Sequence, residues 1–542
     1  MSRIETLVSR PKVVRRALTF GSQSISGPQA AIGLIVVFTI LRLLSCALVG
    51  LGVDEAYTLA IARHLQLSYF DHPPLHIWLV HAFGPLLGYG RLARLPFVML
   101  FVGSSWLLFD LTRRLFGERA GLWALLSLSL AAFFTVAASS WVLPDGPLIF
   151  CLLAAARELI GLIFPAKNAE LDDGAARWKW LRLGLWIGLA GLSKYQAAIF
   201  GLGVAGFLMS TPIGRAWLRR PEPYLAALAA ALVVSPVIVW NAQHDWASFA
   251  FQGGRAVPSH GLHPVAAMTA LLGQMALLLP WIFVPLMAAG REALRAGPAD
   301  TRRWLCVMLS LPGVALFTLT PIWGQAGLPH WSMAAWLFLM PVMGAGLARA
   351  ADHRKWPRTW AVASLAALLL LWGLVVSCAA TGWVGATWPR TFAKGDPTVV
   401  LVDWQLSDPA ASVVDLVSEP GAFAVAMKWN EGGRVLQMLG DPTTIVVLSD
   451  DPRGFADIYP TASLVGRDAV IVVKPEDLVG GLGRIGRCFE HIEPLQVARF
   501  GREGRRELEL HLFAGRRLKA ACSQVGRRGT IARAQWMALD RR

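Results

Sequence analysis

Long apolar segments separated by short polar connections run along the chain up to about residue 382. An apolar run of about 20 residues can span a bilayer as a helix, because all of its backbone hydrogen bonds are internal. The pattern predicts an α-helical polytopic membrane protein with about 11 transmembrane helices, if 181–211 forms two short helices rather than one bent helix. We expect helices near residues 31–51, 92–111, 119–138, 144–163, 181–193, 196–211, 223–240, 265–289, 304–321, 331–348 and 359–381.

Basic residues in the connections predict how these helices are oriented. Lys and Arg accumulate in short loops that stay in the cytoplasm, and here they gather in alternate connections. We therefore expect a cytoplasmic N-terminus and a first apolar run that is retained as a signal anchor. The opposite connections carry few cations and hold most of the acids, histidines and tryptophans of the membrane region; they cover 52–91, 143–146, 241–264 and 322–330. Because they are long and polar, we expect the chemistry on this outer side.

Composition agrees with the membrane assignment. Hydrophobic residues make up 55% of the chain and charged residues only 16%, with a mean hydropathy of +0.50, whereas soluble domains are about a quarter charged. A formal charge of +16 would suggest a nucleic-acid partner in a soluble protein. Here the cations lie mainly in short loops between apolar runs, so we predict no nucleic-acid partner.

The composition changes after about residue 382, which predicts two domains, 1–382 in the membrane and 383–542 outside it. Short β-type runs at 398–402, 444–448, 469–473 and 508–512 alternate with polar stretches, as in a small soluble α/β domain. Cys488 and Cys522 lie in this part and can form a disulfide if it is exported; the alternative is two free thiols. No cysteine pair has zinc-finger spacing.

The first outer connection is the richest in chemical groups. Asp54, Glu55 and Tyr57 directly follow the first apolar run, and Asp71-His72 precede two prolines that stiffen the backbone. Acids beside aromatic residues at the membrane surface can form a water-poor pocket in which a carboxylate acts as a base or holds a cation. The alternative is a set of solvated loop acids. Metal binding by the nearby histidines is disfavoured because the prolines interrupt helical spacing, although a divalent cation stays open as the only cofactor considered.

Charges also interrupt later apolar runs. Asp145 lies in a Pro-Asp-Gly-Pro turn, and Lys194-Tyr195 interrupt a run of small and apolar residues. A charge at membrane depth is costly unless it has a partner or a watery cavity, which makes these residues candidates for binding substrate. Lys194 is the natural partner of an anion; alternatively, it extends to the interface or pairs with Asp145.

Aromatic and amide residues gather in the connection 241–264. The segment Trp240-Asn241-Ala242-Gln243-His244-Asp245-Trp246 is followed by Gln252 and Arg255, and His330 lies in a similar setting near a later connection. Sugar rings stack on aromatic faces and bind amides, while arginine binds phosphate oxygens with two parallel hydrogen bonds. An ordinary aromatic belt at the membrane interface has the same composition.

Taken in order, these segments resemble a known family. They look like the motif series of bacterial relatives of the protein O-mannosyltransferases and of the lipid A aminoarabinose transferase, over about residues 30–380. The motifs are Asp54-Glu55-Ala56-Tyr57, Tyr69-Phe70-Asp71-His72-Pro73-Pro74, Leu143-Pro144-Asp145-Gly146-Pro147, Leu192-Ser193-Lys194-Tyr195 and the tryptophan-containing segment 240–246.

The resemblance implies a GT-C fold in a bacterial inner membrane, with the active site and the C-terminal domain in the periplasm. It implies transfer, with inversion, of a sugar from a polyprenyl-phosphate donor to a glycolipid, glycan or protein acceptor. Asp54 matches an essential acid, and Lys194 matches a lysine near the carrier phosphate. Asp71-His72 matches an acid–lysine pair of the aminoarabinose transferases, so the histidine is a departure whose charge and role the resemblance does not define.

Two other classes stay open. A transporter or flippase of lipid-linked sugars would show inverted repeats and broken helices meeting at midplane, and the sequence suggests neither. A non-catalytic envelope assembly protein would use its C-terminal domain to bind a partner.

Overall fold

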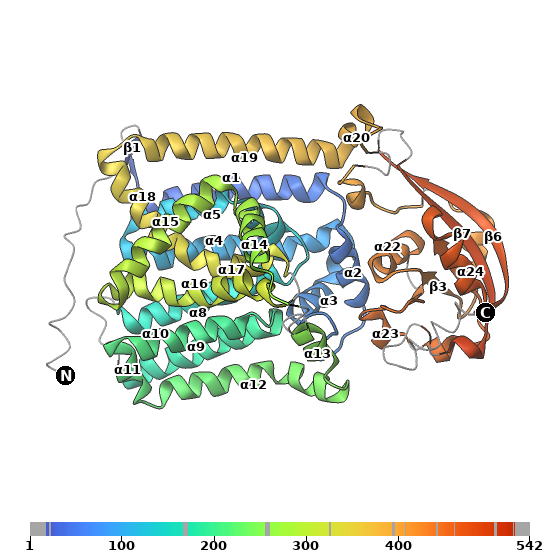
Figure 1. The fold of residues 1–542 in the computed structure, drawn as a ribbon, viewed down its shortest axis with the longest axis horizontal. Helices are drawn as coiled ribbons and strands as arrows, with labels where there is room; N and C mark the ends of the chain where they lie inside the picture. The colour runs from blue at the N-terminus through green and yellow to red at the C-terminus, as the bar shows by residue number, and fades with distance from the viewer. Residues whose placement is uncertain are drawn as a thin grey trace.

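The chain forms a helical region and a smaller region built on a β-sheet (Figure 1). The computed structural model describes residues 18–20, 23–165, 172–254, 261–324, 327–392, 396–406, 408–440, 443–459, 461–502, 507–523 and 525. A two-stranded hairpin, β1 (Leu18–Phe20) and β2 (Gln23–Ile25), precedes the helices. Helix α1 then starts after Ser26, whose side chain accepts a hydrogen bond from the Gln29 amide in a capping box.

Seven segments of the described chain are helical, long and apolar enough to cross a membrane. The prediction of a polytopic helical membrane protein is therefore confirmed. The seven are α1 (Gly27–Leu48), η2 with α4 (Arg91–Phe116), α8 (Asp145–Ile163), α12 (Glu222–Gln243), α16 with η5 (Thr301–Ile322), η6 to α18 (Pro329–His353) and α19 (Trp356–Thr381).

Three further helix pairs are apolar enough to cross but are sharply bent, so the number of crossings is up to ten. The expectations of one continuous helix at 119–138 and at 265–289 are wrong, whereas the third break falls at Thr211, where the helix predicted at 196–211 ends. Pro212 and Pro280 each open the second helix of a pair, and proline removes a backbone donor and disfavours a helical residue before it. The pairs are α5 (Glu118–Leu130) with α6 (Ala132–Thr135) and α7 (Ala137–Ser140), bent by 83°, α10 (Ala197–Ser210) with α11 (Pro212–Leu218), 106°, and α14 (Pro264–Leu278) with α15 (Pro280–Ala296), 114°.

Helix α9 (Asp173–Ser193) has 21 residues but is not among the apolar spans, because Arg177, Lys179 and Arg182 lie within it. The predicted number of about 11 crossings thus stays a prediction. The other helices of the helical region are short: α2 (Val53–Ile61), α3 (Leu75–Leu87), α13 (Ala247–Gly253), α17 (Met333–Trp336) and α20 (Trp383–Thr387).

The C-terminal sheet has five strands in the order β4-β3-β5-β7-β6. β3 (Phe423–Ala426), β4 (Thr444–Val447) and β5 (Ala469–Val473) are parallel, while β6 (Phe489–Phe500) and β7 (Leu508–Leu518) add an antiparallel pair. The predicted strands at 444–448, 469–473 and 508–512 are confirmed. The helices of this region are α21 (Ala411–Ser418), α22 (Trp429–Leu439), α23 (Phe455–Ile458) and α24 (Gly480–Gly486).

The strand predicted at 398–402 is wrong, since Val399–Leu401 forms a 3-10 turn. Asp396 accepts hydrogen bonds from both the backbone amide and the hydroxyl of Thr398, and such local side-chain bonds compete with a sheet ladder. Elsewhere in this region, Cys488 and Cys522 form the disulfide that the sequence left open.

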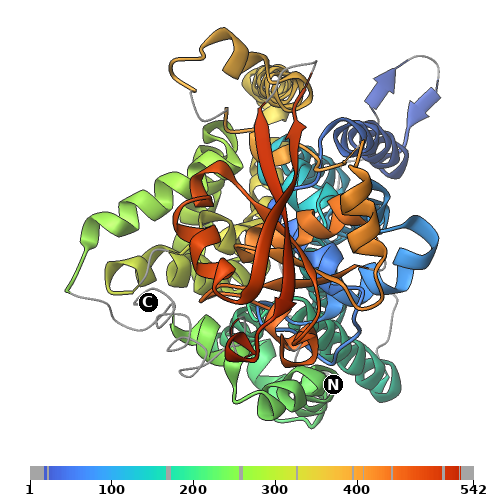
Figure 2. The same cartoon turned by 90° about the vertical axis from the view of Figure 1, so that its right-hand side faces the viewer.

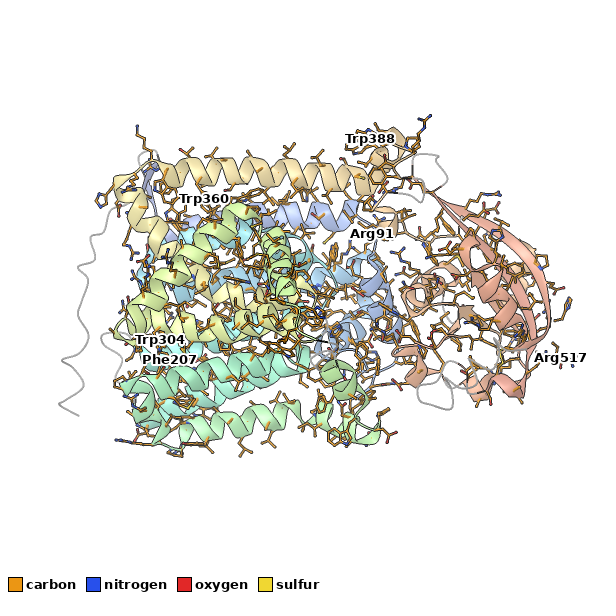
Figure 3. The ribbon with its side chains drawn as sticks, in the orientation of Figure 1. Arg91, Phe207, Trp304, Trp360, Trp388 and Arg517 are labelled. Carbon is orange, nitrogen blue, oxygen red and sulfur yellow. A yellow bond between two sulfur atoms is a disulfide. The ribbon has the colours of Figure 1, made fainter. Side chains whose placement is uncertain are left out.

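One apolar core joins the two regions. Leu59 and Ile77 of α2 and α3 share a buried cluster with Val435, Phe455 and Val470 of the sheet region. Figure 1 shows α2 and α3 between the helix bundle and the sheet, and Figure 2 shows the sheet lying across that end of the bundle. Figure 3 shows Arg91 at this boundary, where its guanidinium binds Asp403 at 2.6 Å.

Candidate functional site

Helix α2 places two adjacent acids at the boundary between the two regions, in different surroundings. Glu55 is fully buried and accepts hydrogen bonds from Arg94 at 2.6 and 2.8 Å, from the Gly52 amide at 2.8 Å and from the Val142 amide at 3.0 Å. All four bonds end on its two carboxylate oxygens. We expected Glu55 to bind substrate. Its carboxylate oxygens already accept four hydrogen bonds from the protein, which argues against that role.

Asp54 is exposed and makes no hydrogen bond or ion pair with any residue that the structure describes. Protein atoms around its carboxylate partly remove it from water and raise its pKa, while the charges of Arg453 and Lys194 favour the ionised form. Asp54 is therefore an accessible carboxylate whose ionised form is stabilised by two cations from distant parts of the chain.

Lys194 and Asp145 form a buried ion pair. Lys194 Nζ lies 3.0 and 3.1 Å from the two carboxylate oxygens of Asp145, and the two residues are 6% and 4% exposed. Asp145 opens α8, where the helix dipole favours an anion, and Lys194 follows the last residue of α9. The hydroxyl of Ser193 donates to the Pro144 carbonyl at 2.6 Å and holds the two helix ends together. The alternative pairing considered for Lys194 is thus present.

Histidines surround this pair. His76 is fully buried, and burial lowers its pKa to about 3, so it is neutral near pH 7; the charges of Asp145 and Lys194 act on it. His72 lies 5.7 Å from His76 between ring centroids. His330 is also within reach of both charges and stacks on Phe133. Among the described residues, no group of three or more His, Cys, Asp or Glu is placed to hold a metal ion.

Asp71 meets the C-terminal region. The Tyr57 hydroxyl interacts with Asp71 and accepts a hydrogen bond from the Gly454 amide at 3.0 Å, and burial followed by the Asp71 charge raises the pKa of Tyr57. Arg453 Nη1 lies 3.8 Å from Asp71 Oδ2. The acid predicted from the first outer connection therefore faces a guanidinium from a segment almost 400 residues away in the sequence.

Arg453 is the functional candidate that the sequence analysis missed. Its guanidinium lies over the rings of Trp429 at 4.5 Å and Phe251 at 4.8 Å, and it binds Asp451 at 3.0 Å. Its φ of 52° lies in the left-handed region, which side chains rarely adopt and which often marks functional sites. The only sequence signal is the turn-like segment from Asp451 to Gly454, which does not indicate what the arginine contacts.

The aromatic segment lies on the same side. Gln252 donates to the Asp71 carbonyl at 2.5 Å, and the Trp240 indole donates to the Gln66 side chain at 3.2 Å. The Tyr195 hydroxyl shares a 2.7 Å hydrogen bond with Ser248. The first two contacts connect α13 and α12 to the first outer connection, and the third connects α13 to the segment between α9 and α10. Arg255, also predicted as a substrate ligand, lies outside the described residues.

Known proteins resemble this chain in sequence. The family described as dolichyl-phosphate-mannose-protein mannosyltransferase matches residues 71–240. The lipid A galacturonosyltransferase RgtD of Rhizobium johnstonii is 27% identical over 340 residues, which are 61% of this chain and 67% of that protein.

Two solved structures share the fold. The structure of ArnT from Cupriavidus metallidurans bound to undecaprenyl phosphate has a TM-score of 0.60 at 14% identity, covering 89% of this chain and 97% of that one. The apo structure of the same protein has a TM-score of 0.59 at 14% identity, covering 89% and 98%. At this level of identity the likeness concerns the fold alone.

Proposed function

We propose that the chain is a glycosyltransferase of the GT-C type and that it transfers a sugar from a polyprenyl phosphate to a lipid acceptor, as the family match, the similarity to RgtD and the shared fold of ArnT support. The reaction takes place on the periplasmic face of a bacterial inner membrane and inverts the anomeric carbon. The acceptor is a lipid A-like glycolipid, in line with the similarity to RgtD.

The observation that carries this proposal is the set of charges around Asp54. The accessible carboxylate of Asp54 interacts electrostatically with Lys194, which pairs with Asp145, and with Arg453. These groups lie where α2 meets the sheet region. A transfer from a phosphate carrier requires a cation for the leaving phosphate and a base for the incoming hydroxyl. This site offers both kinds of group.

Asp54 and Lys194 have different roles in the proposed reaction. The acceptor oxygen bonds to the anomeric carbon while the bond from that carbon to the phosphate oxygen breaks, and the phosphate leaves as an anion. Asp54 takes the proton of the acceptor hydroxyl, and its raised pKa makes it a better base than a free aspartate. If the acceptor is a phosphate, no proton needs to be removed and Asp54 orients the acceptor instead.

Lys194 stabilises the leaving phosphate. Its ammonium has three N–H donors, and its contacts with described residues go to the two oxygens of Asp145. Asp145 thus holds the ammonium in place, while the remaining donor is available to a phosphate oxygen. In a buried site such a contact is worth several kcal/mol, that is, on the order of 10²–10³ in rate.

The Cys488–Cys522 disulfide and the basic connections support the orientation. Disulfides persist in the periplasm and are rare in the bacterial cytosol, so the pairing of Cys488 with Cys522 supports a sheet region outside the cytoplasm. With it we propose the cytoplasmic N-terminus that the basic connections predict and the division into two domains at about residue 382. A reporter fused after Arg542 tests it, and a cytoplasmic signal there would contradict the proposed topology.

In-vitro transfer from a radiolabelled polyprenyl-phosphate sugar to a lipid extract tests the function. We expect Asp54→Asn to lower the rate at least about 100-fold, because a general base contributes 10²–10⁴. Asp415→Asn is a matched control, since Asp415 is an exposed acid on α21. Activity of the Asp54 variant equal to that of the control would reject Asp54 as the base.

The same assay separates the other two classes. A transporter or flippase would move the labelled lipid between leaflets and leave the sugar on its carrier. A non-catalytic assembly protein would do neither. The bent helices alone do not favour transport, because proline accounts for two of the three breaks. Appearance of label in a new glycolipid distinguishes a transferase from both.

A further inference from the structure

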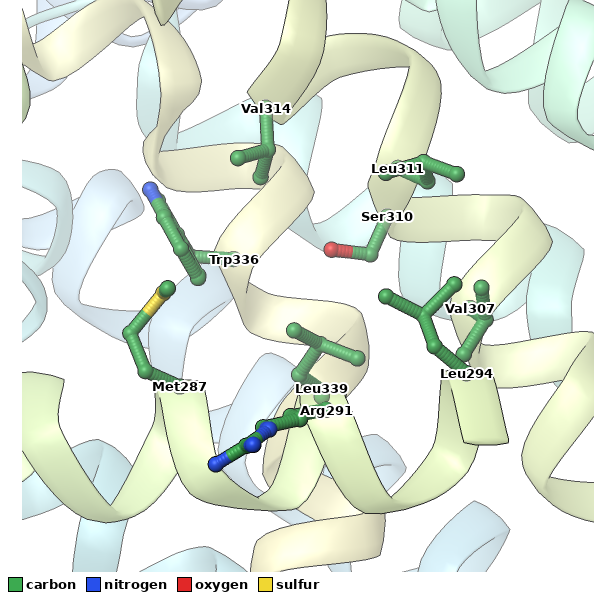
Figure 4. Close-up of a pocket in the computed structure, with 10 residues that line it drawn as sticks. Met287, Arg291, Leu294, Val307, Ser310, Leu311, Val314, Trp336 and Leu339 are labelled. Carbon is green, nitrogen blue, oxygen red and sulfur yellow. The ribbon is translucent and has the colours of Figure 1, made fainter. Parts of the chain in front are cut away.

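An apolar groove of about 200 Å³ lies between α15, α16 and η7 (Leu337–Leu339), away from the acids of α2 (Figure 4). On the same measure one water needs only about 10–15 Å³, so the groove has room for a much larger group. Met287, Leu294 and Leu311 line it and are each 40–45% exposed, so it opens at the surface of the helical region. This surface faces lipid in a membrane.

The groove extends into the bundle from the end that is far from the sheet. Figure 1 shows α15 and α16 meeting at the end of the helical region opposite the sheet. Arg291 lies five residues before the end of α15 at Ala296, or about 8 Å along the helix. Ser310 lies nine residues after the start of α16 at Thr301, or about 14 Å. Ser310 is therefore deeper in the bundle than Arg291 by about one helical turn.

Both polar residues of the groove lack a protein partner within the part of the chain that the structure describes. Ser310 is 1% exposed, yet its hydroxyl makes no hydrogen bond, and Figure 4 shows it pointing into the groove across from Trp336. Arg291 lies at the edge beside Leu339, is exposed and has no ion pair with a described residue. A buried hydroxyl without a partner is costly, so the site favours a ligand with a hydrogen-bonding group at that depth.

We propose that this groove binds an anionic phospholipid from the leaflet far from α2. The headgroup phosphate binds Arg291, an ester carbonyl accepts a hydrogen bond from Ser310, and one acyl chain lies along the apolar walls. Ester carbonyls lie just below the phosphate in a bilayer, which matches the deeper position of Ser310. A polyprenyl phosphate has no ester carbonyl, and its phosphate is expected near Lys194 at the other end of the bundle. The proposal does not depend on the glycosyltransfer reaction.

Native mass spectrometry of the purified full chain tests the proposal, with phosphatidylglycerol and phosphatidylcholine as probes. We expect wild type to retain phosphatidylglycerol in preference to phosphatidylcholine. Arg291→Gln lowers phosphatidylglycerol binding about tenfold, because it removes charge-assisted hydrogen bonds to the phosphate. Arg295→Gln is the matched control, since Arg295 is exposed on the same helix and does not line the groove.

A second variant fills the groove. Ser310→Phe should reduce binding of both lipids by blocking the acyl chain, and its melting temperature shows whether the protein is folded. If Ser310→Phe fails to fold, Arg291→Gln still tests the proposal, because replacing a surface residue leaves the fold intact. Equal lipid binding by the Arg291 and Arg295 variants overturns the proposal. The proposal is also overturned if undecaprenyl phosphate displaces phosphatidylglycerol from wild type but not from Arg291→Gln, because the site at Arg291 would then bind the polyprenyl carrier.

Discussion

Replacing Glu55 by glutamine should destabilise the protein much more than replacing its neighbour Asp54 by asparagine. Each carboxylate oxygen of Glu55 accepts two hydrogen bonds, Oε1 from Arg94 Nε and the Val142 amide, and Oε2 from Arg94 Nη2 and the Gly52 amide. Whichever way the glutamine amide is turned, its NH₂ group faces two donors. Asp54 has no such partners among the described residues.

The magnitude follows from burial. Glu55 and Arg94 are both fully buried, and breaking a buried ion pair from one side typically costs about 3–5 kcal/mol because the remaining charge is uncompensated. We expect this to lower the melting temperature of Glu55→Gln by roughly 5–10 °C. Asp54→Asn should change the free energy of unfolding by no more than about 0.5 kcal/mol, as is usual for a surface substitution.

Thermal unfolding in detergent, followed by tryptophan fluorescence, measures both effects. The sugar-transfer rate per folded molecule should show the opposite order, with Glu55→Gln within a few-fold of wild type and Asp54→Asn nearly inactive. An Arg94→Met change added to Glu55→Gln should recover part of the lost stability, since no uncompensated charge is left. A Glu55→Gln protein that melts with wild type but transfers no sugar would refute this division of roles.

Three further predictions concern other parts of the molecule. Arg453→Gln should lower the transfer rate about tenfold or more and lower the melting temperature less than Glu55→Gln does, whereas Arg499→Gln, on the exposed strand β6, should change neither. The pKa of His76 is lowered to about 3 from 6.5, so the unfolded state binds more protons below pH 6.5. The melting temperature should therefore fall as the pH is lowered from 6.5 toward 3, and His76→Gln should flatten that dependence; an equally steep dependence in the variant would exclude His76 as its source. Cys488→Ser with Cys522→Ser opens a loop of 34 residues and should cost the sheet region about 3–4 kcal/mol, measured as increased proteolysis of that region, while unchanged proteolysis would argue that the cysteines are not paired.

The position of Arg453 shows how the sheet region contributes to the site. Its guanidinium lies between Trp429 of the sheet region and Phe251 of the helical region, and it faces Asp71. The Tyr57 ring packs edge-on against Trp429, and its hydroxyl accepts from the Gly454 amide. The sheet region thus forms one wall of the site, so a chain truncated near residue 382 should lose transfer activity.

Much of the architecture could be predicted from the sequence. Apolar runs long enough for a bilayer specify helices directly, because a backbone in lipid must satisfy its own hydrogen bonds. Three of the strand patterns also held, since alternation and β-branched residues reflect local preferences. Spacing alone did not show the bend at Pro280, because apolar composition continues across it.

The sequence by itself determined which residues carry charge at the membrane surface, and the motif order indicated their family. Only the tertiary structure decided what each charge does. Asp54 and Glu55 are chemically alike and adjacent, yet Arg94 and two backbone amides occupy one and leave the other accessible. Arg453 faces Asp71 because the sheet packs on α2. Burial and partners depend on contacts between residues far apart in the chain, which no local pattern encodes.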